Sequence, residues 1–221
     1  MDEEIAILKA NLKNEATTKI GPIEFFKGQI ANSDVVLVKS GIGKVQAGIT
    51  AALMLTNFKI DYLVNTGSAG GIGTDLKIGD VVISTETAYH DVDVTAAGYE
   101  IGQLPNCPAR FPASRDLEAQ ITKAAEAANL ETHSGLIVSG DQFVASKEVI
   151  DHIKDNFSDA LCVEMEGAAI GQVAYDFDVP YVVIRAMSDV GDEDANTNFD
   201  EFIIEAGKRS AEMMMNVFQS N

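Results

Sequence analysis

The chain has 221 residues, 46% hydrophobic and 23% charged, which is typical of a globular protein with a sizeable core and excludes disordered, collagen-like and mucin-like chains. Its 16 Lys and Arg against 34 Asp and Glu give a formal net charge of −18, which disfavours nucleic acid and anionic membranes as partners, because both attract basic side chains. A neutral or zwitterionic small molecule stays open as a ligand, and the acidity alone indicates solubility.

The cysteine content and the first residues bear on location. Cys107 and Cys162 are too few for a disulfide scaffold and form no C-x-x-C pair. Residues 1–4 are acidic and lack the basic and apolar regions of a secretory signal, and no apolar run approaches the ~20 residues that span a bilayer. We therefore expect a reduced, cytoplasmic protein.

Short β-branched runs alternate with longer helical periods along the chain, which predicts a single α/β domain over residues 1–221. Several of the runs are apolar throughout, as in strands of a largely parallel sheet that is buried on both faces. In chain order we expect a helix at 3–11, an antiparallel pair within 18–30, a strand at 34–39, a helix at 44–57, strands at 61–65 and 80–84, a helix at 114–128, a strand at 134–139, a helix at 146–156, a strand at 160–163, a helix at 167–176, a strand at 181–186 and a helix at 199–218.

Two glycine-rich turns follow expected strands. Residues 40–44 (Ser-Gly-Ile-Gly-Lys) open a helix, but they match neither a Walker A loop nor a dinucleotide fingerprint, so a tight strand-to-helix turn is favoured over a phosphate cradle. Residues 66–71 (Thr-Gly-Ser-Ala-Gly-Gly) would let a flat ligand approach the backbone at the carboxyl end of a strand. A close turn against a neighbouring helix is the alternative there.

Carboxylates mark the ends of two further strands. Glu164 and Glu166 stand between a strand and a helix, where compensation of the helix dipole is the favoured interpretation for either one alone. Asp189 follows the apolar strand at 181–186, whose one charge is Arg185, and a catalytic role there is as well supported as a structural one. The three histidines have no ligand spacing and G-x-S-x-G is absent, so we expect neither a metal nor a serine nucleophile.

Taken together, a series of motifs resembles the bacterial 5'-methylthioadenosine/S-adenosylhomocysteine nucleosidases, in order over nearly the whole chain. The Glu-Met-Glu motif at 164–166 and the Ser-Asp motif at 188–189 indicate the broader nucleoside phosphorylase superfamily. His-Asp-Val-Asp-Val-Thr at 90–95 and Gly-Gln-Leu-Pro at 102–105 favour the nucleosidase branch. The other matching segments are residues 40–45, 65–71, 98–100, 139–143 and 185–187.

The resemblance implies a three-layer α/β/α fold with a mixed central sheet, a homodimer, and hydrolysis of the adenine–ribose bond of methylthioadenosine and S-adenosylhomocysteine without a cofactor. It implies that Asp189, supported by Ser188, protonates or hydrogen-bonds adenine N7. Glu4 would position the attacking water, while Glu166 would hold the ribose hydroxyls and Met165 would pack on the sugar.

The resemblance implies further contacts around the substrate. Phe143 would stack on adenine and the Val144 backbone would bond the base edge. Ser68 and Arg185 belong to the same substrate-binding set. The remaining expected contacts are with the 5'-alkylthio group: Met1, Ile42 and Phe199 from the same chain, and Tyr99 and Pro105 from the partner subunit.

Two departures from the family stand out. Relatives usually begin with a short apolar strand that ends in Gly-Ala before the residue matching Met1, and this segment is absent. We therefore expect a gap in the sheet and a loosely anchored Glu4, and our hypothesis is that the sequence starts at an internal methionine or has lost its first strand. Ala97 stands where relatives commonly carry an aromatic residue, which would widen the alkylthio pocket.

Three alternative functions stay open. A purine nucleoside phosphorylase needs basic residues for phosphate, and Arg185 is the one obvious local candidate, so water is the favoured nucleophile. A futalosine-type hydrolase belongs to the same superfamily. A non-catalytic nucleoside-binding protein is the alternative from another class, and the absent first strand makes it credible.

Overall fold

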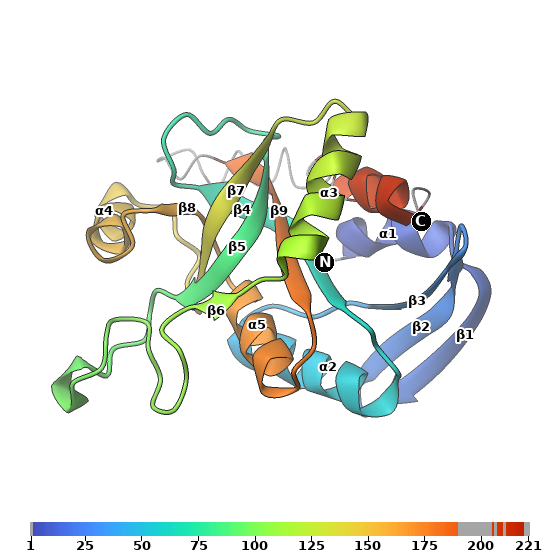
Figure 1. Cartoon of the computed structure of the whole chain (residues 1–221), viewed down its shortest axis with the longest axis horizontal. Helices are drawn as coiled ribbons and strands as arrows, with labels where there is room; N and C mark the ends of the chain where they lie inside the picture. The colour runs from blue at the N-terminus through green and yellow to red at the C-terminus, as the bar shows by residue number, and fades with distance from the viewer. Residues whose placement is uncertain (1, 190–204, 206, 210, 219–221) are drawn as a thin grey trace.

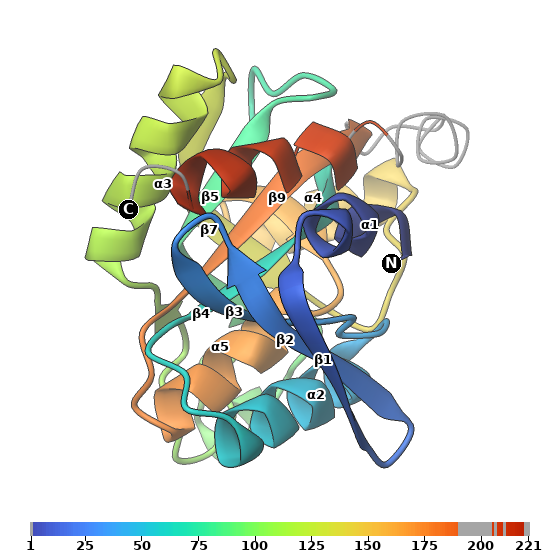
Figure 2. The same cartoon turned by 90° about the vertical axis from the view of Figure 1, so that its right-hand side faces the viewer.

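The computed structural model describes residues 2–189, 205, 207–209 and 211–218. Helices cover both sides of a central sheet: α1, α3 and the helical residues near the C-terminus lie on one side, and α2 and α5 on the other (Figures 1 and 2). This arrangement confirms the expected three-layer α/β/α fold with a mixed sheet. The helices are α1 (Asp2–Ala10), α2 (Lys44–Asn57), the 3-10 turn η1 (Thr95–Ala97), α3 (Arg115–Ala127), α4 (Lys147–Asn156) and α5 (Gly167–Asp176).

Two sheets are present in the described part of the chain. The first is an antiparallel meander of β1 (Lys13–Ile20), β2 (Ile23–Ile30) and β3 (Ser33–Val38). The second sheet has the order β6-β5-β7-β8-β4-β9. A further pairing of β5 with β9 closes this sheet on itself. Its strands are β4 (Leu63–Gly71), β5 (Val81–Tyr89), β6 (Phe111–Pro112), β7 (Thr132–Ser139), β8 (Ala160–Glu164) and β9 (Tyr181–Asp189).

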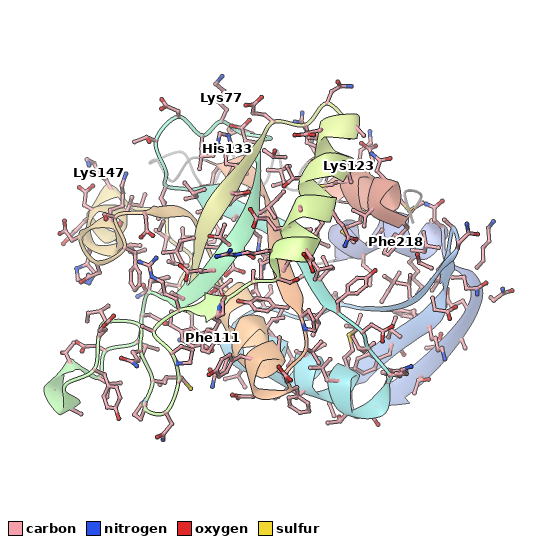
Figure 3. The ribbon with its side chains drawn as sticks, viewed as in Figure 1. Lys77, Phe111, Lys123, His133, Lys147 and Phe218 are labelled. Atoms are coloured by element: carbon pink, nitrogen blue, oxygen red, sulfur yellow. The ribbon has the colours of Figure 1, made fainter. Side chains whose placement is uncertain are left out.

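The core explains why the central strands are apolar on both faces. Every residue of β9 is buried, and alternate side chains point to opposite sides of the sheet. Val183 packs in the cluster that contains residues of α2 and α5, whereas Val182 and Ile184 pack with residues of α3 and the C-terminal helix. Beside α5, Phe111 packs edge-on against Tyr89 (Figure 3).

Three strands continue beyond their expected ends. β4 runs to Gly71, so the glycine-rich segment at 66–71 is strand rather than turn, and β5 runs to Tyr89. β9 runs to Asp189, which is therefore its last residue instead of the residue beyond it. The extensions of β4 and β9 form because Gly70 lies opposite both Asp189 of β9 and Val163 of β8, and these pairings outweigh the weak strand propensity of small residues. The extension of β5 forms because Ala88 and Tyr89 pair with Val138 and Ser139 of β7.

A cavity of about 670 Å³ separates β3 from β4. β3 pairs with β2, and β4 pairs with β9 and, at its last residues, with β8, so the edges of β3 and β4 that face this cavity have no strand partner among the described residues. Side chains of α1 and α2, including Ile5, Ala47 and Ala51, line it. The gap that the sequence predicts in the sheet lies here.

β1 begins at Lys13, five residues before the expected antiparallel pair. The other differences concern short or undescribed segments. β6 and η1 are not expected from the sequence, because two or three residues carry no periodic pattern. Within the expected helix at 199–218, residues 205, 207–209 and 211–218 are helical, and Phe199 lies outside the described residues.

Candidate active site

A pocket of about 370 Å³ lies at the carboxyl ends of several strands of the central sheet. Open α/β sheets bind ligands at this edge, and the volume is typical of a small-molecule site. The lining comes from the turn after β3, from β4, from the loop after β7, from the β8–α5 junction and from the end of β9. Its residues are Ser40, Gly41, Ile42, Thr66, Ser68, Ala69, Gly70, Gln142, Phe143, Val144, Val163, Glu164, Met165, Glu166, Arg185, Ser188 and Asp189.

Most of the predicted site residues gather in this pocket. Those that line it are Ile42, Ser68, Phe143, Val144, Met165, Glu166, Arg185, Ser188 and Asp189. Tyr99 and Pro105 do not line it; they belong to the long connection between β5 and β6, which extends away from the body of the chain (Figure 1). Glu4 lies in α1, but its side chain, like Met1 and Phe199, is outside the described part of the chain.

Asp189 ends β9 against the backbone of β4. It is 3% exposed, and the Ser188 hydroxyl donates to its carboxylate over 3.0 Å. A Cβ atom on Gly70 would stand 2.9 Å from Asp189 Oδ1, so only glycine at this position leaves the carboxyl group its place. The result is an acid held by short-range contacts in the wall of the pocket, where it can exchange a proton with a bound ring nitrogen.

The two acids at the β8–α5 junction have different roles. Glu164 accepts hydrogen bonds from the backbone N–H groups of Glu166 (3.0 Å) and Gly167 (2.8 Å), at the N-terminus of α5. The dipole interpretation therefore holds for Glu164. Glu166 is the N-cap residue of α5, but its side chain makes no capping bond and instead accepts from the Gly43 N–H at 2.9 Å. Glu166 thus faces the pocket.

Arg185 is the buried cation of the site. Its side chain is 4% exposed, and its Nη2 donates to Asn65 Oδ1 at 2.6 Å and to the Glu164 carboxylate. The same nitrogen lies 3.6 Å from Glu166 Oε2, which is an ion-pair distance beyond normal hydrogen-bond length. Two carboxylates and an amide therefore surround one guanidinium group.

A second polar cluster anchors the loop that carries Phe143. Lys44 donates its N–H to Asp141 Oδ1 at 2.8 Å and its Nζ to Asp91 at 2.7 Å, and the Asp141 N–H donates to Asp91 at 2.9 Å. Burial alone would raise the pKa of Asp91, but the hydrogen bonds from Lys44 and Asp141 outweigh it and lower that pKa. The start of α2 is thereby tied to the loops after β5 and β7.

The same contacts decide between the two interpretations of residues 40–44. Gly43 has a φ of 86°, a left-handed conformation that favours glycine, directly before α2. The N–H groups of Gly43 and Lys44, which a phosphate cradle would use, donate instead to Glu166 and Asp141. The segment is therefore a strand-to-helix turn held by carboxylates.

Comparison with known proteins agrees with this geometry. The family model described as "Phosphorylase superfamily" matches residues 1–219. The 5'-methylthioadenosine/S-adenosylhomocysteine nucleosidase from Neisseria meningitidis, solved in complex with methylthio-immucillin-A, is 44% identical over 100% of this chain and 96% of its own, with a TM-score of 0.97. This chain belongs to the 5'-methylthioadenosine/S-adenosylhomocysteine nucleosidases.

Other nucleosidases of the family are equally similar. The enzyme from Colwellia psychrerythraea, solved with adenine, is 43% identical over 99% of this chain and 91% of its own, with a TM-score of 0.96. The enzyme from Streptococcus pneumoniae, solved with the transition-state inhibitor MT-ImmA, is 45% identical over 99% of this chain and 95% of its own, with a TM-score of 0.95. The fold of these nucleosidases therefore extends over essentially the whole chain.

Sequence reasoning missed the supports of this nucleosidase site. It assigned no contact to Asn65 or Ser139, and it treated Glu164 apart from Arg185. A signal for the last pair exists, because a lone arginine inside an apolar strand requires a buried carboxylate partner. The Asp91–Lys44–Asp141 cluster carries no such signal, because Lys44 lies 47 residues from Asp91 and 97 residues from Asp141, and Asp91 lies 50 residues from Asp141.

Two features are absent from the described residues of this nucleosidase chain. No group of three or more His, Cys, Asp or Glu side chains among them is arranged to hold a metal ion. None of the helices among them is both long and apolar enough to cross a membrane.

Proposed function

We propose that the chain hydrolyses the N-glycosidic bond of 5'-methylthioadenosine and S-adenosylhomocysteine, releasing adenine and a 5-thioribose product. The observation that carries the proposal is that Asp189 and the Glu166–Arg185 pair line the same pocket. It stands in a chain 43–45% identical to nucleosidases whose structures hold adenine or a transition-state inhibitor. Breaking this bond leaves negative charge on the purine and positive charge on the sugar, so it needs an acid and a carboxylate on the two sides.

Asp189 serves the purine side of the reaction in this proposal. Its carboxyl group, supported by the Ser188 hydroxyl, protonates or hydrogen-bonds adenine N7 and so lowers the cost of the departing anion. Phe143, which is 50% exposed at the pocket, offers a ring for stacking on the base. The backbone of Val144 then bonds the edge of the base.

Glu166 serves the sugar side. Its carboxylate lines the pocket and holds the ribose hydroxyls, with Met165 packed on the sugar and Ser68 and Arg185 beside it. Negative charge near C1' stabilises the oxocarbenium-like sugar as the bond breaks. Glu4 positions the attacking water in this scheme, as the family resemblance implies.

Water is favoured over phosphate as the nucleophile. Among the described residues that line the pocket, Arg185 is the one with a basic side chain, and its guanidinium group is ion-paired with the carboxylates of Glu164 and Glu166. The amides of Gly43 and Lys44 donate to carboxylates rather than to an open anion site. A phosphate ion would meet net negative charge, which supports hydrolysis over phosphorolysis.

The proposal extends to a homodimer in the cytoplasm. The exposed apolar side chains of Ile42, Val45 and Ile49 lie at the start of α2, beside the pocket, and a partner subunit would cover them. Tyr99 and Pro105, which do not line the pocket of their own chain, would then reach the 5'-alkylthio end of the partner's site. Met1, Ile42 and Phe199 complete that subsite in the proposal.

Adenine release tests the proposal. The purified chain is incubated with 5'-methylthioadenosine and with S-adenosylhomocysteine, with and without inorganic phosphate, and free adenine is measured. We expect release from both substrates without phosphate. Strict dependence on phosphate would assign a nucleoside phosphorylase instead, and tight binding of the nucleosides without turnover would assign a binding protein.

A further inference from the structure

Glu164 is one of three carboxylates in the pocket wall, beside Glu166 and Asp189. Its side chain is 2% exposed, and it accepts from the N–H groups of Glu166 and Gly167, from the Ser139 hydroxyl and from Arg185. A carboxylate offers about four acceptor sites, so these donors occupy them. Glu164 therefore has no capacity left for a substrate and acts through its neighbours.

Arg185 stands between two competing carboxylates. Its Nη2 donates to Glu164 and Asn65, while Glu166 Oε2 stays 3.6 Å away. In a water-excluded site an arginine pairs strongly with whichever carboxylate reaches it, commonly through two parallel hydrogen bonds. A Glu166 carboxylate paired in that way would lose the lone pairs that ribose hydroxyls need.

We propose that Glu164 is a positioning residue that holds the Arg185 guanidinium off Glu166, so that the Glu166 carboxylate can accept the ribose hydroxyls. This inference rests on the proposed function. Recognition of the ribose hydroxyls then depends on the position of Arg185 between the carboxylates of Glu164 and Glu166, and not on Glu166 alone. Glu164 positions both Arg185 and Glu166, because it also accepts a hydrogen bond from the backbone N–H of Glu166. The positions of the carboxylate and of the guanidinium therefore depend on one side chain.

The substitution Glu164→Gln tests the inference. Glutamine keeps an oxygen for the Gly167 N–H but removes the charge opposite Arg185, so the guanidinium moves toward Glu166. We expect kcat/KM for 5'-methylthioadenosine to fall about 10²-fold, the typical effect of a reacting group displaced by about 1 Å. We also expect the variant to discriminate less than the wild type between this substrate and its 2'-deoxy and 3'-deoxy analogues.

Discrimination against the deoxy analogues is the decisive readout, since a merely structural defect lowers turnover of all three nucleosides alike. Ser139→Ala is the matched control: it removes a hydroxyl that bonds Glu164 and the Ala168 N–H at the same junction but leaves Arg185 its carboxylate. We expect this control to lower the melting temperature and to keep the wild-type discrimination. Unchanged discrimination in Glu164→Gln would overturn the inference.

A second variant covers the case in which Glu164→Gln does not fold. Asn65→Ala removes a second described acceptor of Arg185 Nη2 and leaves the hydrogen bonds of Glu164 to α5 in place. We expect a smaller loss of discrimination in the same direction, and its absence would overturn the inference. Failure of the proposed function is distinguishable, because the wild-type chain would then release no adenine in the same assay.

Discussion

At the residue scale, the acid role proposed for Asp189 can be tested separately from folding. Asp189→Asn keeps the size of the side chain and an oxygen that can accept from Ser188, but it removes the acid. We expect the rate of adenine release to fall by about 10²–10⁴-fold, the usual contribution of general acid catalysis, with little change in melting temperature. Steady-state kinetics and a thermal melt measure both quantities, and full activity in the folded variant would contradict the assignment.

Glu166 gives a second prediction on the sugar side. Glu166→Gln retains an acceptor for the Gly43 N–H, so the turn before α2 is preserved, while the negative charge near the sugar is lost. We expect a lower kcat and a higher KM, with kcat/KM down at least about tenfold, because a hydrogen bond to a charged group is worth about 1.5–3 kcal/mol. Kinetics with 5'-methylthioadenosine check this, and unchanged kcat and KM would rule out the ribose role.

His90 links stability to pH. Burial lowers the pKa of this imidazole below its ordinary value, although the neighbouring Asp91 acts in the opposite direction. Below about pH 6.5 the unfolded chain therefore binds a proton that the folded chain does not, so the free energy of unfolding falls as the pH decreases until the folded pKa is reached. Urea unfolding between pH 8 and pH 5.5 should show a shallower decline in His90→Asn than in the wild type. Equal slopes would show that His90 does not carry this dependence.

At the element scale, the edges that face the 670 Å³ cavity set local stability. β3 pairs on one side with β2 and faces the cavity with the other, whereas β9 pairs with β4 and, at Ile184–Ala186, also with β5. We expect the backbone amides of β3 to exchange with deuterium at least about tenfold faster than those of β9, because an unpaired edge opens locally with a small free-energy change. β2 is the matched control, since it pairs on both sides within the same small sheet as β3. Equal protection of β2 and β3 would contradict the expectation.

The sequence predicts an element well where its signal is local, and poorly where the element depends on pairing with residues far away in the chain. α2 at 44–57 and α5 at 167–176 match the expected ranges, because helical periodicity and the flanking turns are local signals. The ends of β4 and β9 do not match, since their small or polar residues form strand only through pairing with each other. The different roles of Glu164 and Glu166 are also beyond local pattern, because the Gly43 N–H that orients Glu166 lies 123 residues away in the chain.

At the scale of the whole molecule, the net charge of −18 opposes association of two chains. Basic residues such as Lys77, Lys123 and Lys147 are spread over the surface and point into solvent (Figure 3). A dimer of such chains therefore needs a contact that is mainly apolar, and salt should favour it by screening the repulsion. Val45 and Ile49, one helical turn apart on α2 and 74% and 47% exposed, offer that kind of surface.

The double substitution Val45→Asp/Ile49→Asp tests the dimer. We expect the wild type to sediment as a dimer at micromolar concentration and the variant as a monomer, because two buried aspartates on each side of a two-fold contact would face like charges. Adenine release per chain should fall with dissociation, since the proposed contacts of Tyr99 and Pro105 with the partner's pocket would be lost. Gln120→Asp, an exposed change on α3, is the control and should leave a dimer. A monomeric wild type with full activity would contradict both the contact and the shared pocket.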